Sequence, residues 1–263
     1  MFGGGNKRTR QTRTISVRGP ETVWSKAAEL SRDRGFLLRL GLCLSAIVLV
    51  LLLVQSWKAP FPYRAGQAAS IAVEPGVALT PYSMASAPAE TAATGYLEFL
   101  VKVDGSNRFG ARVSSLEPGL PLIMSPPIGR FTLPASASEH PLLFIAGGTG
   151  IAPLRSMLVE LVNAGRRAGL ALVYSARTPE EFAYLDELRA LHDAGALALT
   201  LTLTGDAQDW RHARGRAGDR HLADLATPET MAFICGPPSM VTDIPEALVR
   251  LGVPRDQIKT EDW

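Results

Sequence analysis

The sequence predicts two domains, a small antiparallel β-sheet or β-barrel followed by an α/β domain with a doubly wound parallel sheet, preceded by one hydrophobic helix. Three observations predict this order. Residues 40–57 are uncharged and mostly apolar, residues 61–135 contain short strands separated by turns, and residues 140–263 alternate strands with helices. The 263 residues are enough for two domains of roughly 100–200 residues each.

The first sixty residues differ in charge from the rest of the chain. They contain ten Lys/Arg against three Asp/Glu, whereas residues 61–263 contain seventeen against twenty-two. A basic segment at 1–39 followed by an eighteen-residue apolar run predicts a transmembrane or membrane-interface helix at 40–57, with a buried core helix as the alternative. The mildly acidic remainder argues against a nucleic-acid partner.

The β-rich region begins after Pro60-Phe61-Pro62, which marks a boundary. Strands are predicted at Ala68–Val73, Tyr96–Val103 and Leu120–Met124, and turn residues separate them. Several short strands in succession favour a small antiparallel sheet or barrel.

The α/β region begins with the apolar strand Leu142–Ala146. Apolar residues then recur at helical spacing from Leu154 to Val162, which predicts a helix that ends at Gly165. Further strands are predicted at Leu170–Ser175, Leu197–Thr204, Met231–Cys235 and Gln257–Glu261. Strands that alternate with helices predict a parallel sheet whose ligand crevice lies at the strand ends.

Two helices of this region carry local signals. Thr178-Pro179-Glu180-Glu181 predicts a helix start, with Thr178 as the cap and Glu181 completing a capping box. The helix near Ser239–Leu251 contains Pro245, so it is expected to be kinked or interrupted.

A glycine-rich turn, Ala146–Pro153, lies between the first apolar strand and the helix that follows it. Glycine lets the backbone approach a ligand closely, and the N-terminus of a helix attracts phosphate. Thr149 can hydrogen-bond a carboxamide or a ribose. A tight turn without a ligand is the alternative, because the segment is not the G-x-G-x-x-G pattern.

Two further segments, Cys235–Pro238 and Tyr82-Ser83, are weak signals when each is taken alone. Cys235-Gly236-Pro237-Pro238 follows an apolar strand, where ligands of open α/β sheets collect. Taken alone, Cys235 is more often a buried structural cysteine, and Tyr82-Ser83 in the β-rich region is more often core packing. With Cys43 and Cys235 as its only cysteines, the chain cannot hold a four-Cys iron–sulfur cluster, and no metal site is expected.

Together these segments resemble the ferredoxin–NADP reductase family, and in particular its bacterial oxygenase-reductase members, over residues 61–263. The resemblance implies an FAD-binding β-barrel at 61–135 and an NAD(P)-binding α/β domain at 140–263. Tyr82 and Ser83 match the family R-x-Y-S/T motif, whose Tyr stacks on the isoalloxazine and whose Ser faces flavin N5. Gly110–Ser114 looks like a looser form of its pyrophosphate turn, and Pro126–Phe131 like its P-x-G-x-F segment.

The resemblance also implies which residues form the site. Ser83 and Cys235 are the expected catalytic residues, with Cys235 beside the nicotinamide ring. Trp263 is expected to stack on the flavin or to gate the nicotinamide, and Arg177 to contact the adenosine ribose or its 2′-phosphate unless it is a solvated surface residue. The expected cofactor-binding residues are Thr80, Tyr82, Ser83, Gly110, Ala111, Val113, Ser114, Gly147, Gly148, Thr149, Gly150, Pro153, Arg177, Cys235, Gly236, Pro237 and Trp263.

Two departures from the family pattern matter. Thr80 stands where the family has an Arg that neutralises the FAD pyrophosphate, and Arg112 is a candidate substitute. The first two family barrel strands have no counterpart, because the hydrophobic run occupies their place. Arg13–Val17 alternates like a strand, but it reaches the barrel only if the hydrophobic helix does not span.

The expected activity is transfer of a hydride from NAD(P)H to FAD, with electrons passed on to a separate iron–sulfur protein, oxygenase or quinone. The alternative is a membrane-tethered, non-catalytic nucleotide-binding module or fusion whose truncated barrel cannot hold FAD. Residues 1–65 also resemble the start of membrane-bound HD-type phosphohydrolases, although the catalytic metal ligands of that family do not follow. Since the dinucleotide motifs need nicotinamide cofactors, a cytoplasmic reductase body is expected, single-pass or interfacial in its membrane attachment, although the basic N-terminus alone predicts the opposite side for a single span.

Overall fold

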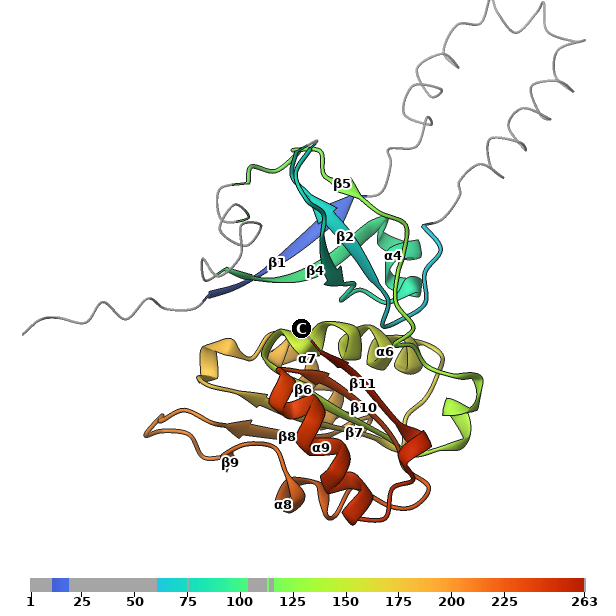
Figure 1. The fold of residues 1–263 in the computed structure, drawn as a ribbon, viewed down its shortest axis with the longest axis vertical. Coiled ribbons are helices and arrows are strands. Elements are labelled where there is room, and N and C mark those ends of the chain that lie inside the picture. Colours follow the sequence, from blue (N-terminus) through green and yellow to red (C-terminus); the bar gives the residue numbers. More distant parts are fainter. Residues whose placement is uncertain (1–10, 19–60, 75, 104–112, 114–115, 263) are drawn as a thin grey trace, which may run out of the picture. The chain divides into compact units, whose positions relative to one another are not determined.

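This computed structural model describes residues 11–18, 61–74, 76–103, 113 and 116–262 (Figure 1). Of the described residues, 11–16 and those from 63 to 262 belong to one compact unit. The hydrophobic helix expected at 40–57 lies outside the described residues. In the part of the chain that is described, none of the helices combines the length and the apolar character needed to cross a bilayer.

A six-stranded parallel sheet forms the α/β half, as the alternating pattern predicts (Figure 1). Its spatial order is β11-β10-β6-β7-β8-β9, so the chain starts at β6, moves outward on one side and then returns to the other side of β6. The reversal between β6 and β10 is a topological switch point, where open α/β sheets bind ligands. The strands are β6 Leu142–Gly147, β7 Leu170–Ala176, β8 Ala198–Leu203, β9 Ala213–Arg214, β10 Met231–Gly236 and β11 Ile258–Asp262.

Helices cover both faces of this sheet (Figure 1). On β6, Leu142 and Phe144 pack in the cluster that contains helix α6, whereas Leu143 and Ile145 pack in the opposite cluster. All six residues of β6 and of β10 are buried, which explains their uninterrupted apolar sequences. Helices α6 Ile151–Asn163 and α7 Leu185–Asp193 contribute to one cluster, and α8 Asp219–Leu222 and α9 Pro238–Arg250 to the other.

The capping box predicted at Thr178 is wrong. Pro179–Glu181 forms only one 3₁₀ turn, Thr178 makes no cap hydrogen bond, and the Glu181 carboxylate accepts from the Arg177 backbone N–H at 3.0 Å. The ring of Phe182 stacks on Trp210 at 5.3 Å between ring centroids, and its edge meets Tyr174 at 4.9 Å. Burial of this ring holds Phe182 in an extended conformation, so α7 starts only after Tyr184.

Pro245 was expected to kink or interrupt its helix; α9 is not interrupted there and continues from Pro238 to Arg250. Proline removes one helical hydrogen bond. On either side of it, however, Ile244, Ala247 and Leu248 are buried against the sheet. Burial of this apolar face compensates for the missing bond.

The β-rich half contains two small sheets rather than one closed barrel among the described residues. Strands β3 Thr80–Ser83, β2 Ala68–Ala72 and β5 Ile123–Met124 form one antiparallel sheet, and β1 Gln11–Arg18 pairs with β4 Tyr96–Val103 in the other. A single bridge, Met84 to Phe99, joins β4 to the residue after β3. Strand β1 therefore gives β4 a partner. The segment Arg13–Val17, whose alternating sequence suggested a strand, lies within β1.

Helix α4, Pro88–Thr94, was not predicted. Its N-cap is Ala87, which has no side-chain acceptor, and the Glu90 carboxylate instead accepts from the Ala87 N–H at 2.8 Å. The remaining short turns are 3₁₀ helices at Ala135–Glu139, Gly148–Gly150 and Arg255–Gln257.

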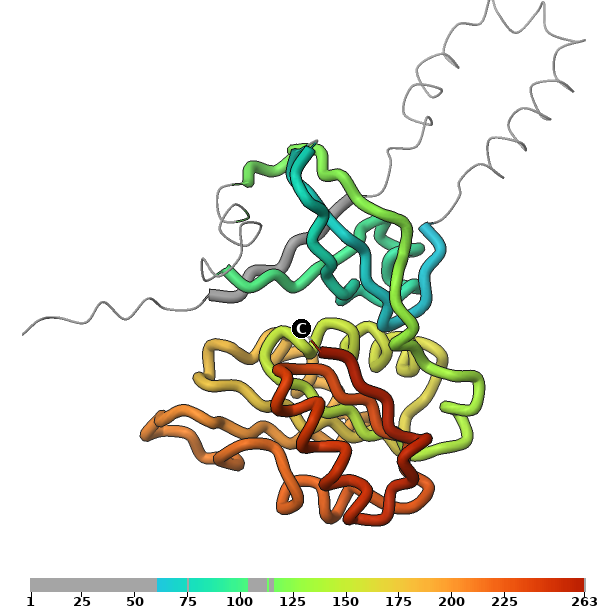
Figure 2. Tube along the Cα trace, in the orientation of Figure 1, coloured from blue at the N-terminus to red at the C-terminus, as the bar shows by residue number. Residues whose placement is uncertain are grey.

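The chain passes from β5 to β6 through residues 125–141, the green segment of the trace in Figure 2. Phe131 in this segment is 7% exposed and meets Phe233 of β10 edge-on, with ring centroids 5.9 Å apart. The Arg64 guanidinium donates to the Leu133 carbonyl at 2.7 Å. The connection is thus packed against both halves rather than being a free linker.

Candidate functional site

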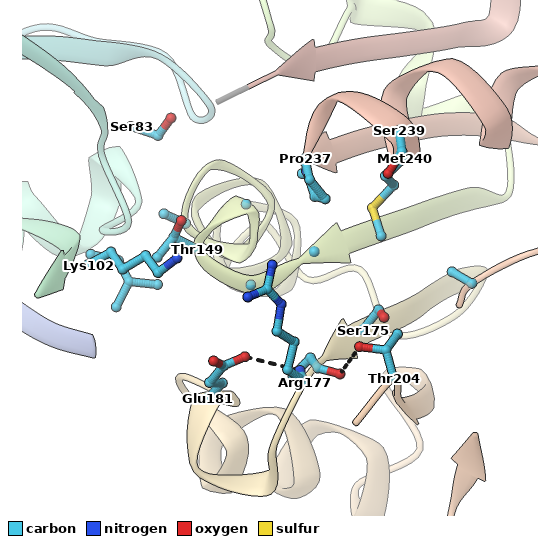
Figure 3. Close-up of a pocket in the computed structure, with 18 of the residues that line it drawn as sticks. Ser83, Lys102, Thr149, Ser175, Arg177, Glu181, Thr204, Pro237, Ser239 and Met240 are labelled. Atoms are coloured by element: carbon cyan, nitrogen blue, oxygen red, sulfur yellow. Dashed lines mark hydrogen bonds between the residues drawn. The ribbon is translucent and has the colours of Figure 1, made fainter. Parts of the chain in front are cut away.

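One cavity of about 670 Å³ is lined by residues from both halves (Figure 3). The β-rich half contributes residues of β3 and β4, and the α/β half contributes the turns that follow β6, β7, β8 and β10. The residues that line the cavity include Thr80, Tyr82, Ser83, Lys102, Gly147, Gly148, Thr149, Gly150, Arg177, Glu181, Arg216, Gly236, Pro237, Met240 and Asp243.

Three glycines keep the switch point narrow. A Cβ on Gly150 would lie 2.5 Å from the Cys235 carbonyl carbon and 2.9 Å from the Gly236 nitrogen. A Cβ on Gly147 would meet Pro237 Cδ at 2.7 Å, and one on Gly236 would meet Met240 Sδ at 2.7 Å. The two turns after β6 and β10 therefore approach each other as closely as backbones allow, and no other residue type fits there.

The buried side chain of Tyr174 holds the glycine turn after β6 in place. Its hydroxyl donates to the Gly148 carbonyl at 3.0 Å and accepts from the Ala183 N–H at 3.2 Å. Burial raises the pKa of Tyr174 well above its usual value, so the phenol stays protonated and able to donate. Gly148 itself has φ +56°, a left-handed conformation that this bond helps to hold.

Replacing Tyr174 with Phe is expected to lower the free energy of unfolding by about 1–3 kcal/mol and to weaken nicotinamide binding. The change leaves the partly buried Ala183 N–H without its acceptor and the Gly148 carbonyl without its donor, and the loss of such hydrogen bonds costs about this much. Urea unfolding and titration with NADH and NADPH measure the two effects. Unchanged stability together with unchanged affinity would refute this role of Tyr174.

Ser83 has the feature expected of a ligand contact. It is 6% exposed, it lines the cavity, and its Oγ has no hydrogen-bond partner among the described residues. A buried hydroxyl without a partner costs free energy unless a ligand satisfies it. Together with the glycine cradle across the cavity, Ser83 fits a pair of bound cofactors, one against each half.

Charged side chains surround the rest of the cavity. Lys102, Arg177 and Arg216 line it, as do Glu181 and Asp243. Figure 3 shows the Arg177 guanidinium extending into the cavity from the end of β7. Of the four arginines considered from the sequence as phosphate partners, only Arg177 and Arg216 line it; Arg214 instead donates to the Trp210 carbonyl at 3.3 Å, and Arg211 is exposed elsewhere.

The sequence-predicted residues fall into three groups. Those that line the cavity are Thr80, Tyr82, Ser83, Gly147, Gly148, Thr149, Gly150, Arg177, Gly236 and Pro237. Pro153, Cys235 and Val113 are buried but do not line it. Gly110, Ala111, Ser114 and Trp263 lie outside the described residues, as does Arg112.

Cys235 is fully buried, and its side chain belongs to the apolar cluster on the α6 face of the sheet. The residues on either side of it explain this position. Ile234 packs in the opposite cluster, and Gly236 and Pro237 line the cavity. The turn after β10 thus reaches the cavity through Gly236 and Pro237 rather than through the Cys235 side chain.

Sequence reasoning missed Lys102, Met240 and Asp243. Lys102 is the one cation within β4, Tyr96–Val103, and it falls on the same strand face as Glu98, so in the sequence it looks like a solvated charge. Met240 and Asp243 lie on successive turns of α9, at a spacing of three residues, which places them on one helix face. The predicted helix near Ser239–Leu251 already contained both residues, but nothing in the sequence showed that this face lines a cavity.

An ion-pair cluster surrounds the buried side chain of Arg155. The Arg155 side chain of α6 is 8% exposed and is paired with Glu90 at 3.1 Å and Glu187 at 2.7 Å, with Glu98 at 3.9 Å. Three carboxylates thus share one guanidinium. Loss of hydration raises the pKa of Glu98, and Arg155 and the Tyr184 hydroxyl only partly oppose this.

Replacing Glu98 with Gln is expected to increase the free energy of unfolding at about pH 7 and to leave it unchanged at about pH 4. Because the pKa of Glu98 is raised above its ordinary value of 4.5 in the folded state, the folded protein binds more protons than the unfolded chain above that pH. The glutamate therefore costs stability as pH rises, and the amide does not. Urea unfolding at both pH values tests this; a variant less stable at pH 7 contradicts it.

Comparisons with known proteins agree with this geometry. The family model described as "Oxidoreductase NAD-binding domain" matches residues 144–246. A ferredoxin–NADP reductase B of Sorangium cellulosum is 34% identical over 204 residues, which cover 69% of this chain and 77% of that protein. The electron transfer component of the xylene/toluene monooxygenase of Pseudomonas putida is 30% identical over 198 residues, 73% of this chain and 55% of that protein.

Solved structures show the same fold. The ferredoxin–NADP⁺ reductase of Neisseria gonorrhoeae, solved with bound FAD and NADP, superimposes with a TM-score of 0.65 at 23% identity, covering 78% of this chain and 88% of that one. The chain spans about half the length of the monooxygenase reductase components that it matches. The chain belongs to the ferredoxin–NADP reductase family of FAD- and NAD(P)H-dependent oxidoreductases.

Proposed function

We propose that this protein takes reducing equivalents from NAD(P)H and passes electrons to a separate acceptor protein. One observation carries the proposal: a single cavity is lined both by Tyr82 and Ser83 of the β-rich half and by the glycine turns of the α/β half. Bound FAD would supply the ability to accept a hydride from nicotinamide and to release electrons singly, and the chain supplies position and electrostatics.

On the β-rich side, we propose that Tyr82 packs against the flavin ring and that the Ser83 hydroxyl hydrogen-bonds it. Ser83 is suited to this because its Oγ is buried and has no described protein partner. Thr80 replaces the cation that the family carries at this place. Lys102 lines the same cavity from β4 and would supply positive charge toward the pyrophosphate.

On the α/β side, we propose that Gly147–Gly150 and Gly236-Pro237 hold the nicotinamide half of the dinucleotide, with Thr149 bonding its carboxamide or ribose. Because Cys235 and Pro153 are buried, we propose that they contribute by fixing the backbone of the two turns rather than by touching the nucleotide with their side chains. Arg177 and Arg216 would meet the adenosine ribose or its 2′-phosphate, because both line the cavity beyond β7 and β9. The segment Gly110–Ser114 keeps the FAD-binding role that the resemblance implies, and Trp263 keeps its expected role of stacking on the flavin or gating the nicotinamide.

The acceptor and the location belong to the same proposal. Relatives named as monooxygenase reductase components favour an iron–sulfur protein or oxygenase as the acceptor, with a quinone as the alternative. A dinucleotide cavity needs a compartment that contains nicotinamide cofactors, so we place the reductase body in the cytoplasm. Attachment to a membrane through residues 40–57 remains a proposal from the sequence.

A flavin spectrum tests this function. The full-length protein, purified with added FAD, is expected to be yellow and to lose its flavin absorbance when NADH or NADPH is added anaerobically. Comparing the two nucleotides reports the preference set by Arg177 and Arg216. A colourless protein that FAD does not reconstitute would instead support the non-catalytic nucleotide-binding module, and a phosphohydrolase fragment would hydrolyse phosphoesters with added metal.

A further inference from the structure

The Arg155 side chain donates five hydrogen bonds, yet it does not line the cavity. It lies in the first turns of α6, five residues after Gly150, and only 7% of the residue is exposed. A buried guanidinium whose N–H groups lack acceptors strongly destabilises the fold. The acceptors that surround the Arg155 guanidinium therefore show which segments of the chain it connects.

All five N–H donors of Arg155 have acceptors. Nε donates to Glu187 at 2.7 Å and one terminal nitrogen donates to the same carboxylate at 3.0 Å. Both terminal nitrogens donate to Glu90 at 3.1 Å, and one of them also donates to the Ala85 carbonyl at 2.8 Å. The guanidinium makes two bidentate pairs, one with α7 and one with α4, and a further bond to the backbone after β3.

These partners belong to the two walls of the cavity. Ala85 follows Ser83 by two residues, and α4 follows shortly after, so both continue the β-rich wall. Arg155 lies in α6, which begins directly after the glycine turn, and α7 belongs to the same α/β half. One side chain thus connects the segment that carries Ser83 with the helix that starts at the nicotinamide turn.

Neighbouring contacts reinforce this connection. The Ser156 hydroxyl donates to the Ser86 carbonyl at 2.7 Å, and both residues are buried. Tyr184 contributes twice, since the Arg155 guanidinium lies 4.7 Å from its ring centroid and its hydroxyl donates to Glu98 at 3.2 Å. Tyr184 adopts a left-handed conformation, φ 58°, which is uncommon for a tyrosine and fits a residue held by these contacts.

We propose that Arg155 is a positioning residue that sets the separation between Ser83 and the Gly147–Gly150 turn, and thereby the distance between the two cofactor rings. This inference depends on the proposed function. Hydride transfer requires reacting atoms about 3–3.5 Å apart, and a misplacement of about 1 Å costs roughly a hundredfold in rate. A rigid, planar, five-donor group is suited to fixing such a distance.

Lysine cannot replace arginine here. An ammonium has three donors at one point and cannot form two bidentate pairs and a carbonyl bond at once. The Arg155→Lys variant keeps the charge but not the fork geometry. It therefore separates an effect of charge on stability from an effect of position on hydride transfer.

The test uses the full-length, FAD-loaded Arg155→Lys variant with Arg250→Lys as the matched control. Arg250 is 60% exposed and pairs with Asp219 at 2.9 Å on the α8–α9 surface. Stopped-flow flavin reduction at saturating nucleotide is expected to fall roughly ten- to a hundredfold in Arg155→Lys, with the nicotinamide–flavin charge-transfer absorbance lost and the nucleotide Kd changed less than about threefold. Arg250→Lys should match the parent protein in every measurement.

A second readout needs no cofactor. In the protein without FAD, amide hydrogen exchange is expected to become faster at residues 83–90 and 185–190 in Arg155→Lys, and to stay unchanged in Arg250→Lys. If Arg155→Lys does not fold, Glu187→Gln, which weakens one bidentate pair and keeps the guanidinium, takes its place. Reduction at the parent rate, with the charge-transfer band intact, would overturn the inference. Failure of the parent protein itself to be reduced would overturn the proposed function.

Discussion

Replacing Gly150 with Ala is expected to destabilise the fold by about 2–3 kcal/mol and to raise the Kd for NADH and NADPH at least about tenfold. The added methyl group would overlap the Cys235 carbonyl, which belongs to the backbone and cannot rotate away. To admit it, the helix start after β6 must move away from the turn after β10. That movement opens the crevice in which we place the nicotinamide. Thermal unfolding and nucleotide titration measure the two effects.

Gly218→Ala is the control for this substitution. Gly218 has an extended φ of 178°, and the nearest atom to an added Cβ is 4.0 Å away. Its replacement is expected to change stability by less than about 1 kcal/mol. If Gly150→Ala matches Gly218→Ala in both measurements, the close approach of the turns after β6 and β10 is required neither for stability nor for nucleotide binding.

Replacing Arg155 with Met is expected to lower the free energy of unfolding by about 3 kcal/mol, the lower end of the cost of breaking a buried ion pair. The methionine fills most of the same space, but Glu90, Glu98 and Glu187 lose their shared counter-charge. The glutamate side chains are 23–33% exposed, so water relieves part of the repulsion. Urea unfolding at about pH 7 measures the loss, and lowering the pH is expected to reduce it as the carboxylates protonate.

Arg250→Met provides the comparison. Its ion pair with Asp219 is exposed on both sides, so its loss is expected to cost less than about 1 kcal/mol. An equal cost for the two substitutions would show that the Arg155 cluster contributes no more than a surface pair.

Much of the α/β half was predictable because its signals are local. Strands β6 and β10 are buried on both faces, so each is a continuous apolar segment, and β7 is nearly so, with Ser175 as its polar residue. The glycine turn after β6 is required by the close approach of Cys235. Strand β9 has two residues and α8 has four, too few for any period to show.

The errors and omissions have tertiary causes. Thr178 has the correct cap sequence, but the packing of Phe182 against Trp210 decides the backbone after it. Lys102 and Arg155 look like surface charges in the sequence. Their importance depends on a cavity and on carboxylates that are distant along the chain, with Glu90 65 residues from Arg155.

The pairing of β1 with β4 joins residues that are far apart in the sequence and gives an edge of β4 a partner. Without residues 11–18, the backbone N–H and C=O groups along that edge would be open to pairing with another chain.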